Sequence, residues 1–405
     1  MKILLLAPHP FYQERGTPIA VDLLLGALSR RGDRVDVVTF AEGADRAYPG
    51  VALHRIPRLP GLRGIRPGFS FKKLACDLFL LARALRLARR GRYDVVHAVE
   101  ESVFIAMLIR LACRVPYVFD MDSSMPRQLI EKYPALAPLG PALRFFEGLA
   151  IRRALAVAPV CDALADIARR HAPRKVCLLQ DVSLLAPVPV AGAAPDGAPP
   201  LPEPEQPCLL YIGNLERYQG IDLLLESFAR LLAGGMRASL WIAGGAPASV
   251  RRYRDKAERL GIGARATFLG PWPVARMAEL MAAADGLVSP RTQGGNTPMK
   301  IYSYLASGKP ILATDLPTHT QVLTPDVAFL AAPEPAAFAD GLRQLIEHPE
   351  AGRARAGRAR ALAAARYSPA AFDRAVGELY QWLEASCGKH PGIGSRAPEE
   401  YRPSG

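Results

Sequence analysis

The feature of this sequence that most constrains its fold is an alternation of apolar runs and amphipathic stretches, which starts at the first residues. KILLLAP (2–8) is a continuous apolar run closed by proline, as expected of a strand buried on both faces. PIAVDLLLGALSRRG (18–32) has apolar side chains at helical spacing and ends in glycine, and RVDVVTF (34–40) is a second strand. A strand, a helix and a strand in this order predict a βαβ unit with parallel strands.

The same alternation occurs in two series, separated by a segment of different composition. The first series continues through PYVFDM (116–121), and the second begins at CLLYIGNL (208–215). Between them, residues 189–207 are rich in proline, glycine and alanine and lack apolar periodicity, so we interpret them as an exposed linker. We therefore expect two open α/β domains, whose ligands bind at the carboxyl ends of the strands. No GxGxxG follows the first strand, which argues against a dinucleotide-dependent oxidoreductase.

Composition narrows the class of protein and of partner. Hydrophobic residues make up 50% of the chain and charged residues 22%, which excludes an intrinsically disordered protein. The net charge of +13 favours an anionic partner: nucleic acid, acidic lipid or a phosphorylated small molecule. Because no helix-turn-helix, RRM or zinc pattern accompanies the charge, we expect no nucleic acid partner.

The cysteines and the N-terminus bear on metal binding and location. The six cysteines form no CxxC pair and have no zinc-finger spacing to a histidine, so we expect reduced thiols and no metal site. Pro8 ends the first apolar run too early for a signal peptide, and no run of about 18 apolar residues is present. These features predict a cytoplasmic protein.

The stretch SPRTQGGNTPMKIYSYLA (289–306) combines the end of a strand, a glycine turn and the start of a helix. Gly294 and Gly295 allow a ligand to approach the backbone, and the amides at the helix start carry partial positive charge. Arg291 and Lys300 add formal charge, so the stretch suits an anion such as a diphosphate. The alternative is an ordinary loop whose glycines only form the turn.

Several motifs together point to one family. They are the first βαβ unit, YIGNLERYQGIDLLLESF (211–228), LWIAGG (240–245), ATFLGPWP (266–273) and NTPMKIYSYLASGKPILATD (296–315). In their order and spacing they resemble the glycosyltransferases of family 4, also called group 1. The resemblance covers nearly the whole chain.

The resemblance implies the GT-B fold, in which two Rossmann-like α/β domains face each other across a cleft. It implies an acceptor-binding domain at 1–188, a donor-binding domain at 208–366, and a helix at 367–387 that returns to the first domain. Residues 388–405 are expected to be a disordered tail. The implied reaction is a retaining transfer from a nucleotide-diphosphate sugar to a lipid-linked or cell-envelope glycan, with no metal or other cofactor.

In its second half, the chain departs from the usual pattern of the family at four positions. Most members have two glutamates separated by seven residues, one facing the transferred sugar and one the ribose; here these positions hold Gly295 and Ser303. Most also have an arginine and a lysine that contact the diphosphate, where this chain has Asn214 and Gln219. The double-glutamate motif is therefore degenerate, and the two polar replacements supply no charge.

Our hypothesis is that three other basic residues, Arg217, Arg291 and Lys300, replace the missing charge. The full set of predicted donor contacts is Gly16, Thr17, Asn214, Arg217, Gln219, Arg291, Gly294, Gly295, Asn296, Thr297, Lys300 and Ser303.

In the first half, Gly16 and Thr17 follow the first strand where the family has a glycine loop, although a plain turn is the alternative. Where many members have a histidine, this chain has Asp120 and Asp122. We predict that Asp122 is catalytic and either stabilises charge at the anomeric carbon or orients the acceptor hydroxyl. Alternatively, either aspartate only caps the following helix. His97 lies within a predicted buried strand and is interpreted as a core histidine.

The segment from His54 to Arg92 has eleven lysines and arginines and a single acid, Asp77, with apolar residues interleaved. Such a segment suits an anionic membrane, which would place the protein at the inner face of the cell membrane. The alternative is a solvated helix face and a basic loop.

The leading hypothesis is therefore an active glycosyltransferase at the membrane surface. The second is a GT-B protein that has lost transfer activity and acts as a binding or partner subunit.

Overall fold

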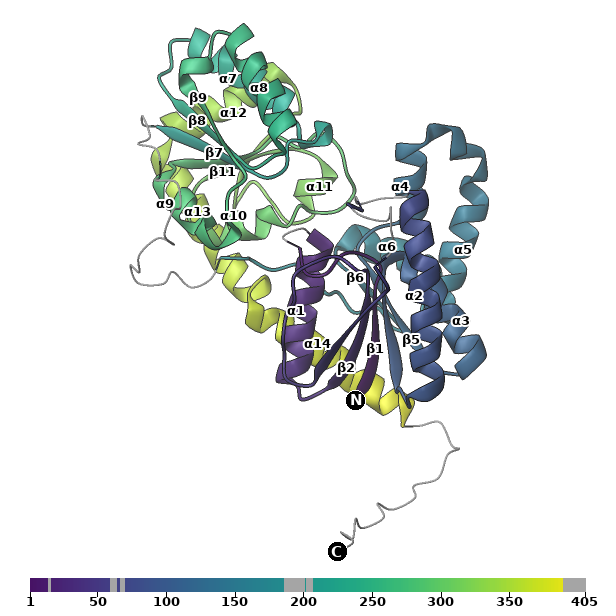
Figure 1. The fold of residues 1–405 in the computed structure, drawn as a ribbon. Coiled ribbons are helices and arrows are strands. Elements are labelled where there is room, and N and C mark those ends of the chain that lie inside the picture. The colour runs from purple at the N-terminus through teal and green to yellow at the C-terminus, as the bar shows by residue number, and fades with distance from the viewer. Residues whose placement is uncertain (14–15, 59–63, 66–69, 186–200, 202–206, 389–405) are drawn as a thin grey trace, which may run out of the picture.

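The computed structural model describes residues 1–13, 16–58, 64–65, 70–185, 201 and 207–388. Its N-terminal half contains a sheet of six parallel strands in the order β3-β2-β1-β4-β5-β6 (Figure 1). The strands are β1 (Lys2–Ala7), β2 (Arg34–Thr39), β3 (Val51–Arg55), β4 (Val95–Val99), β5 (Tyr117–Met121) and β6 (Ala156–Pro159).

The C-terminal half contains a second sheet of six parallel strands, in the order β12-β11-β10-β7-β8-β9. The strands are β7 (Cys208–Ile212), β8 (Ser239–Ala243), β9 (Ala266–Gly270), β10 (Gly286–Ser289), β11 (Ile311–Thr314) and β12 (Phe329–Ala331). Numbered within its own half, each sheet has the order 3-2-1-4-5-6 of the Rossmann fold. The expected α/β class with two Rossmann-like domains is confirmed.

Alternation along β1 explains how helices cover both faces of the first sheet. Leu4 and Leu6 belong to one buried cluster and Ile3 and Leu5 to another, because successive side chains of a strand point to opposite faces. The first cluster includes residues of α2 (Phe71–Arg90), α3 (Val103–Cys113), α5 (Gly140–Arg153) and α6 (Asp162–Arg169). The second includes α1 (Gly16–Arg30) and the last helix, α14 (Pro369–Cys387). The short helix α4 (Met125–Lys132) follows β5.

The second sheet is covered in the same way. One face packs against α7 (Ile221–Ala233), α8 (Pro247–Arg259) and α12 (Pro335–Glu347). The other packs against α9 (Met277–Ala283), α10 (Lys300–Ser307) and α13 (Pro349–Arg366). The remaining helix is α11 (Pro317–Thr320), and 3₁₀ turns lie at η1 (Glu100–Ser102), η2 (Pro134–Leu139), η3 (Arg217–Gln219), η4 (Gly263–Arg265) and η5 (Val274–Arg276).

The last helix ties the two halves together. α14 follows α13 of the C-terminal half, and its Phe372, Val376 and Leu379 are buried in the N-terminal core (Figure 1). Two ion pairs, Arg30 with Asp373 and Arg31 with Glu384, join the last residue of α1 and the residue after it to this helix.

Parts of the sequence-based predictions fall outside the described residues. They are residues 389–405 of the tail, all of the linker 189–207 except 201 and 207, and residues 59–63 and 66–69 of the basic segment. No described helix is both long and apolar enough to cross a membrane.

Candidate functional site

Four carboxylates gather at the carboxyl ends of the N-terminal strands, and we call them the acidic cluster. Glu100 directly follows β4, and Asp120 and Asp122 lie at the end of β5. Asp181 lies two residues beyond Leu179, whose amide donates to the Pro159 carbonyl at the end of β6. Parallel strands bring these loops to one edge of the sheet, which is where ligands of such sheets bind.

Burial and mutual repulsion raise the pKa values of three members. The pKa of Asp122 is raised well above its usual range by burial and by the charges of Asp120 and Glu100, although the Thr17 hydroxyl donates to its carboxylate. The pKa of Glu100 is raised to about 7 by burial and by neighbouring carboxylates, and that of Asp181 to about 7 by burial and by Asp120. Raised pKa values of this kind concentrate at functional sites.

His97 connects the acidic cluster to the last helix. Its ring is completely buried, with Nδ1 2.8 Å from the Tyr380 hydroxyl of α14 and Nε2 3.0 Å from Asp120 Oδ2. Both ring nitrogens thus have partners, as the interpretation of a core histidine requires. Asp120 is held by this histidine, whereas Asp122 bonds to Thr17 at the start of α1.

In the C-terminal half, the corresponding strand ends carry cations. Lys300 Nζ, at the start of α10, lies 3.3 Å from Gln219 Oε1 and 3.9 Å from the centroid of the Tyr211 ring. Its pKa is lowered well below the usual range by burial and by the charge of Arg291. Within the described part of the chain, no carboxylate forms a salt bridge with Lys300 or Arg291.

Arg291 organises the glycine loop that follows β10. Its Nε donates to the Gln293 carbonyl at 2.7 Å, one terminal nitrogen lies 3.3 Å from Asn296 Oδ1, and the guanidinium stacks on the Tyr218 ring at 5.2 Å. Gly294 has φ +124°, and a Cβ there would lie 2.2 Å from the guanidinium. The loop therefore wraps around Arg291 in a way that only glycine permits at this position.

Contacts between the two halves converge on this loop. Gln321, after α11, accepts from the Ala163 amide of α6 at 3.2 Å and donates to the Gly295 carbonyl at 3.1 Å. The Arg127 guanidinium of α4 lies 3.6 Å from where a Cβ of Gly295 would be. The loop thus lies at the boundary with α4 and α6 of the N-terminal half.

The structure brings together some of the predicted site residues and separates others. Thr17 meets Asp122, Gln219 meets Lys300, and Asn296 meets Arg291. Gly16, Asn214, Arg217 and Gly295 are exposed, whereas Thr297 is buried. The Arg217 charge acts on Tyr253 of α8, and no contact joins it to Lys300 among the described residues.

Ser303 occupies the position where most family members have the ribose-facing glutamate. It is only 3% exposed, and its hydroxyl accepts from the Leu184 amide at 3.0 Å. Leu184 belongs to the segment that leaves the N-terminal half. The Ser303 hydroxyl therefore contributes to the connection between the halves.

Two residues of this region were missed in the sequence. Asp181 is not among the predicted site residues, although an acid within the apolar stretch LLQDVSLL is a usable signal. Gln321 gave no local signal, because its importance comes from contacts with two distant segments. His319, near the start of α11, is fully buried between Ser289 and Thr314, and burial lowers its pKa to about 3.

No group of three or more histidine, cysteine, aspartate or glutamate residues is arranged to hold a metal ion in the described ranges. The cysteines there are free.

Comparison with known families identifies the chain. The family model described as "Glycosyl transferases group 1" matches residues 206–348, and that described as "Glycosyl transferase 4-like domain" matches residues 15–179. The chain belongs to the group 1 glycosyltransferases. The two matches divide this glycosyltransferase at the same place as the two sheets do.

Curated relatives match only parts of this group 1 chain. The D-inositol 3-phosphate glycosyltransferase of Nocardia farcinica is 31% identical over 119 residues, which are 28% of this chain and 26% of the relative. The GDP-mannose-dependent alpha-(1-6)-phosphatidylinositol dimannoside mannosyltransferase of Mycobacterium tuberculosis is 27% identical over 198 residues, 48% of this chain and 45% of the relative. The match thus spans less than half the length of either relative.

Solved structures match over almost the whole length. Sucrose-phosphate synthase from Thermosynechococcus elongatus has a TM-score of 0.76 at 20% identity, covering 95% of this chain and 99% of that one. HepE of Anabaena in complex with UDP-glucose has a TM-score of 0.68 at 18% identity, covering 94% and 100%. At these identities the likeness establishes the GT-B fold.

Proposed function

We propose that the protein transfers a sugar, with retention of configuration, from a nucleotide-diphosphate sugar on the C-terminal half to an acceptor on the N-terminal half. The observation that carries this proposal is the contrast between the strand ends: buried or partly buried cations without a salt bridge among the described residues in one half, and partly buried carboxylates in the other.

Lys300 supports a diphosphate in the C-terminal half. Lys300 is partly buried, and a cation withdrawn from water without an anionic partner is costly, so a bound anion offsets that cost. Its Nζ lies 3.3 Å from Gln219 Oε1, the position where most family members have a lysine. We infer that Lys300 supplies from α10 the charge that the family usually supplies from position 219. The solved complexes of HepE with UDP and with UDP-glucose are consistent with such a ligand in this fold.

In this proposal, Arg291 acts mainly through the loop. Arg291 is only 8% exposed, and its guanidinium bonds to the Gln293 carbonyl and the Asn296 side chain of the 293–296 turn. The backbone amides of that turn and of the start of α10 then face the phosphates, as at other helix N-termini that bind anions.

Asp122 is the proposed catalytic residue. The Thr17 hydroxyl donates to its carboxylate, whose pKa is raised by burial and by neighbouring carboxylates. In its deprotonated form it is therefore a stronger base than an exposed aspartate. At the carboxyl end of β5 it is suited to accept the proton of the acceptor hydroxyl or to stabilise positive charge at the anomeric carbon. No metal or cofactor is invoked for this step.

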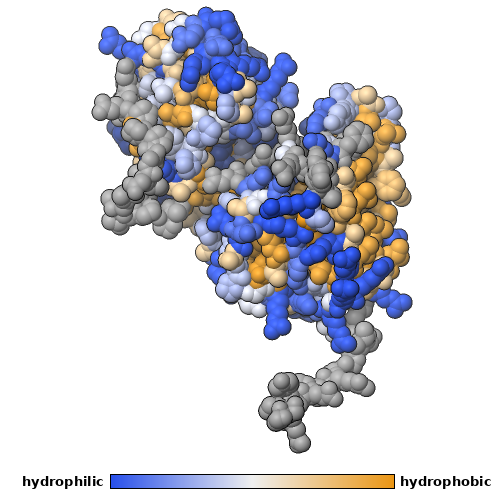
Figure 2. All heavy atoms as spheres, in the orientation of Figure 1, coloured by the Kyte–Doolittle hydropathy of each residue, from blue (hydrophilic) through white to orange (hydrophobic). Residues whose placement is uncertain are grey.

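The proposed acceptor is a lipid-linked or cell-envelope glycan, and the proposed location is an anionic membrane surface. Nine of the ten exposed large apolar side chains of the described residues lie in the N-terminal half, on α2, α3 and the segment 133–146. They are Leu74, Leu78, Phe79, Leu108, Leu111, Tyr133, Leu139, Phe145 and Phe146, and we call them the apolar face. Figure 2 shows this apolar surface over α3 and α5. Exposed Arg86, Arg89 and Arg90 of α2 add positive charge beside it.

An apolar face with adjacent arginines suits a membrane of acidic lipid. The curated mycobacterial relative is named for phosphatidylinositol dimannoside, a lipid, which agrees with this proposal.

The experiment that tests the proposed donor is calorimetric titration of the protein with UDP, GDP, ADP, dTDP and CMP, without metal. We expect saturable binding of one nucleoside diphosphate, and loss of that binding in the Lys300→Ala variant. An exposed basic residue of the same half provides the control, Arg254→Ala. If none of the nucleotides binds, the proposed donor is wrong.

The second candidate is a binding or partner subunit without transfer activity. The observation that favours it is the absence of a carboxylate at Gly295 and at Ser303, whose hydroxyl already accepts from Leu184. Nucleotide-sugar binding without consumption of the donor, measured with crude envelope glycolipid as acceptor, would favour this candidate.

The membrane proposal is tested by sedimentation with vesicles of phosphatidylglycerol and of phosphatidylcholine. We expect binding to the anionic vesicles to fall at least tenfold when Arg86, Arg89 and Arg90 are changed to glutamate, since each basic residue near the surface contributes about 1 kcal/mol. The matched control changes Arg251, Arg254 and Arg259 of α8 to glutamate. Equal loss in both triple variants would indicate a non-specific effect of net charge.

A further inference from the structure

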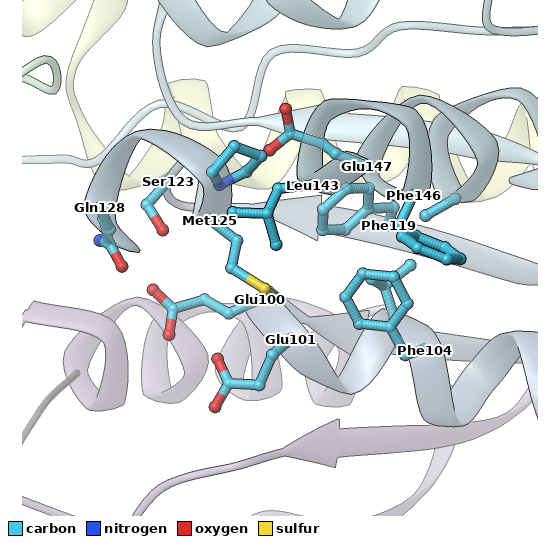
Figure 3. Close-up of a pocket in the computed structure, with 13 residues that line it drawn as sticks. Glu100, Glu101, Phe104, Phe119, Ser123, Met125, Gln128, Leu143, Phe146 and Glu147 are labelled. Atoms are coloured by element: carbon cyan, nitrogen blue, oxygen red, sulfur yellow. The ribbon is translucent and has the colours of Figure 1, made fainter. Parts of the chain in front are cut away.

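The N-terminal half contains an apolar pocket that the proposed donor site does not use. It has a volume of about 310 Å³ and lies between η1, α3, α4 and α5 (Figure 3). This volume is at the lower end of the range of small-molecule sites, about 300–1,000 Å³. A cavity with mainly apolar walls binds water poorly and favours an apolar occupant.

The two ends of the pocket differ in polarity. Glu100, Ser123 and Gln128 lie at one end in Figure 3, and the rings of Phe104, Phe119 and Phe146 lie at the other. Glu100 is also a member of the acidic cluster and interacts electrostatically with Asp122. The polar end of the pocket is therefore the end next to the proposed catalytic residue.

The carboxylates of the pocket select the chemistry of its occupant. Glu100 has a left-handed backbone, φ +49°, which is unfavourable for a residue other than glycine and is typical of functional positions. Glu147 is 5% exposed, and its Oε1 has no hydrogen-bond partner. Burial raises the pKa of Glu147 above its usual range. Such groups repel an anionic head group and bond well to a neutral hydroxyl.

The apolar end of the pocket is continuous with the apolar face. Phe146 lines the pocket and is 53% exposed, and its ring is 5.7 Å from that of Phe145 on the outer surface. Figure 2 shows apolar surface over α5. A chain that enters beside Phe146 would thus come from the side that we propose to face the membrane.

We propose that this pocket binds the apolar chain of a neutral amphiphilic acceptor, whose hydroxylated head group lies at Glu100 and Ser123, next to Asp122. This inference rests on the proposed function for the identity of the occupant as acceptor. The occupant is a single alkyl or prenyl chain with a sugar or polyol head, because the pocket is small and its polar end is acidic.

The first test is calorimetric titration with hexyl, heptyl, octyl and nonyl β-D-glucoside, each below its micelle concentration. We expect saturable binding of one molecule per chain, with affinity increasing about fourfold per methylene until the pocket is full. Affinity that does not depend on chain length, or the absence of saturable binding, would overturn the proposal.

Two neighbouring phenylalanines of α5 provide matched variants. Phe146 lines the pocket, whereas Phe145 does not and is similarly exposed at 59%. Phe146→Ser should weaken binding of octyl glucoside about tenfold, and Phe145→Ser should change it less than twofold. Equal weakening by both would mean that the glucosides adsorb to the outer surface, which overturns the pocket. Since both side chains are exposed, we expect both variants to fold, and circular dichroism checks this.

Octyl sulfate distinguishes the proposed neutral head group from an anionic one. At pH 8 it should bind the pocket at least tenfold more weakly than octyl glucoside, and tighter binding of the sulfate would refute a neutral head group.

Nucleotide titration of Phe146→Ser separates this inference from the proposed function. Glucoside binding without nucleotide binding would support the pocket and contradict the proposed transfer from a nucleotide sugar. Nucleotide binding without glucoside binding would contradict the pocket alone.

Discussion

The two halves of the molecule have the same strand order but opposite charge at the carboxyl ends of their strands. At the N-terminal edge, burial and mutual repulsion raise the pKa values of Asp122, Glu100 and Asp181. At the C-terminal edge, burial lowers the pKa values of Lys300 and Arg291. The common fold therefore sets where the loops meet, and a few loop residues set the chemistry of each edge. Because each edge is electrostatically unfavourable by itself, both point to a ligand with one anionic part and one neutral part.

The largest expected effect tests the acidic edge. Changing Asp122 to Asn should lower kcat by about 10²–10⁴-fold, the usual contribution of a positioned base, while leaving nucleotide affinity unchanged. The assay is transfer of labelled sugar, together with calorimetric titration of the nucleotide.

The exposed Asp166 on α6 provides the control, and Asp166→Asn should be fully active. If Asp122→Asn keeps wild-type kcat, the aspartate is structural, and its bond to Thr17 only positions α1.

The next effect tests the cationic edge. Lys300→Gln should weaken nucleotide binding by about 10–100-fold, since a hydrogen bond to a charged group contributes about 1.5–3 kcal/mol. Because Nζ of Lys300 and Oε1 of Gln219 are 3.3 Å apart, the double variant Lys300→Gln with Gln219→Lys should recover much of the loss.

The single variant Gln219→Lys is the companion control, and two adjacent lysines should not bind better than one by more than a few-fold. Failure of the double variant to recover affinity would show that the position of the charge, and not only its presence, matters.

Much of the fold could be predicted because its signals are local. Apolar runs such as KILLLAP and CLLYIGNL are strands buried on both faces, and the motifs around residues 211–228 and 296–315 fix the family. The position of Lys300 at the candidate site could also be predicted, since it lies in the first turn of a helix that follows a glycine loop.

The rest of the site depends on contacts between distant segments. The pairing of Lys300 with Gln219 joins residues 81 positions apart, and the bonds of Gln321 join three segments. The structure also gives Ser303 and Arg291 roles within the protein, holding Leu184 and the glycine loop, which the sequence does not indicate. Burial decides which acids have raised pKa values, and burial is a property of the assembled sheet.

A smaller effect tests whether the acidic edge is unfavourable by itself. The folded-state pKa of Asp181 is about 7, above its usual value of 3.8. Between these pH values the folded protein holds a proton that the unfolded chain has released, so stability falls as pH rises, and the full cost is present above pH 7. Asp181→Asn should therefore raise the free energy of unfolding by roughly 1–3 kcal/mol at pH 8 and by less at pH 5.

Thermal unfolding at the two pH values measures this difference, and the exposed Asp255→Asn on α8 is the control. An equal gain in the free energy of unfolding at pH 5 and at pH 8 would mean that the pKa of Asp181 is not raised in the folded protein. Loss of transfer activity in the stabilised variant would indicate that the strain serves catalysis.

The smallest effect concerns the link between the two edges. Gln321→Ala removes two hydrogen bonds, one to the Ala163 amide of α6 and one to the Gly295 carbonyl of the glycine loop. Each contributes about 1 kcal/mol at most, so nucleotide affinity should fall only about two- to fivefold, and the chain should remain folded. Gln344→Ala, at an exposed position of α12, provides the control.

If the two edges act on one ligand, the KM values for donor and acceptor should both rise in Gln321→Ala, because the spacing between the two edges is less well defined. A rise in the donor KM alone would mean that Gln321 only supports the glycine loop, and that the two edges are set independently.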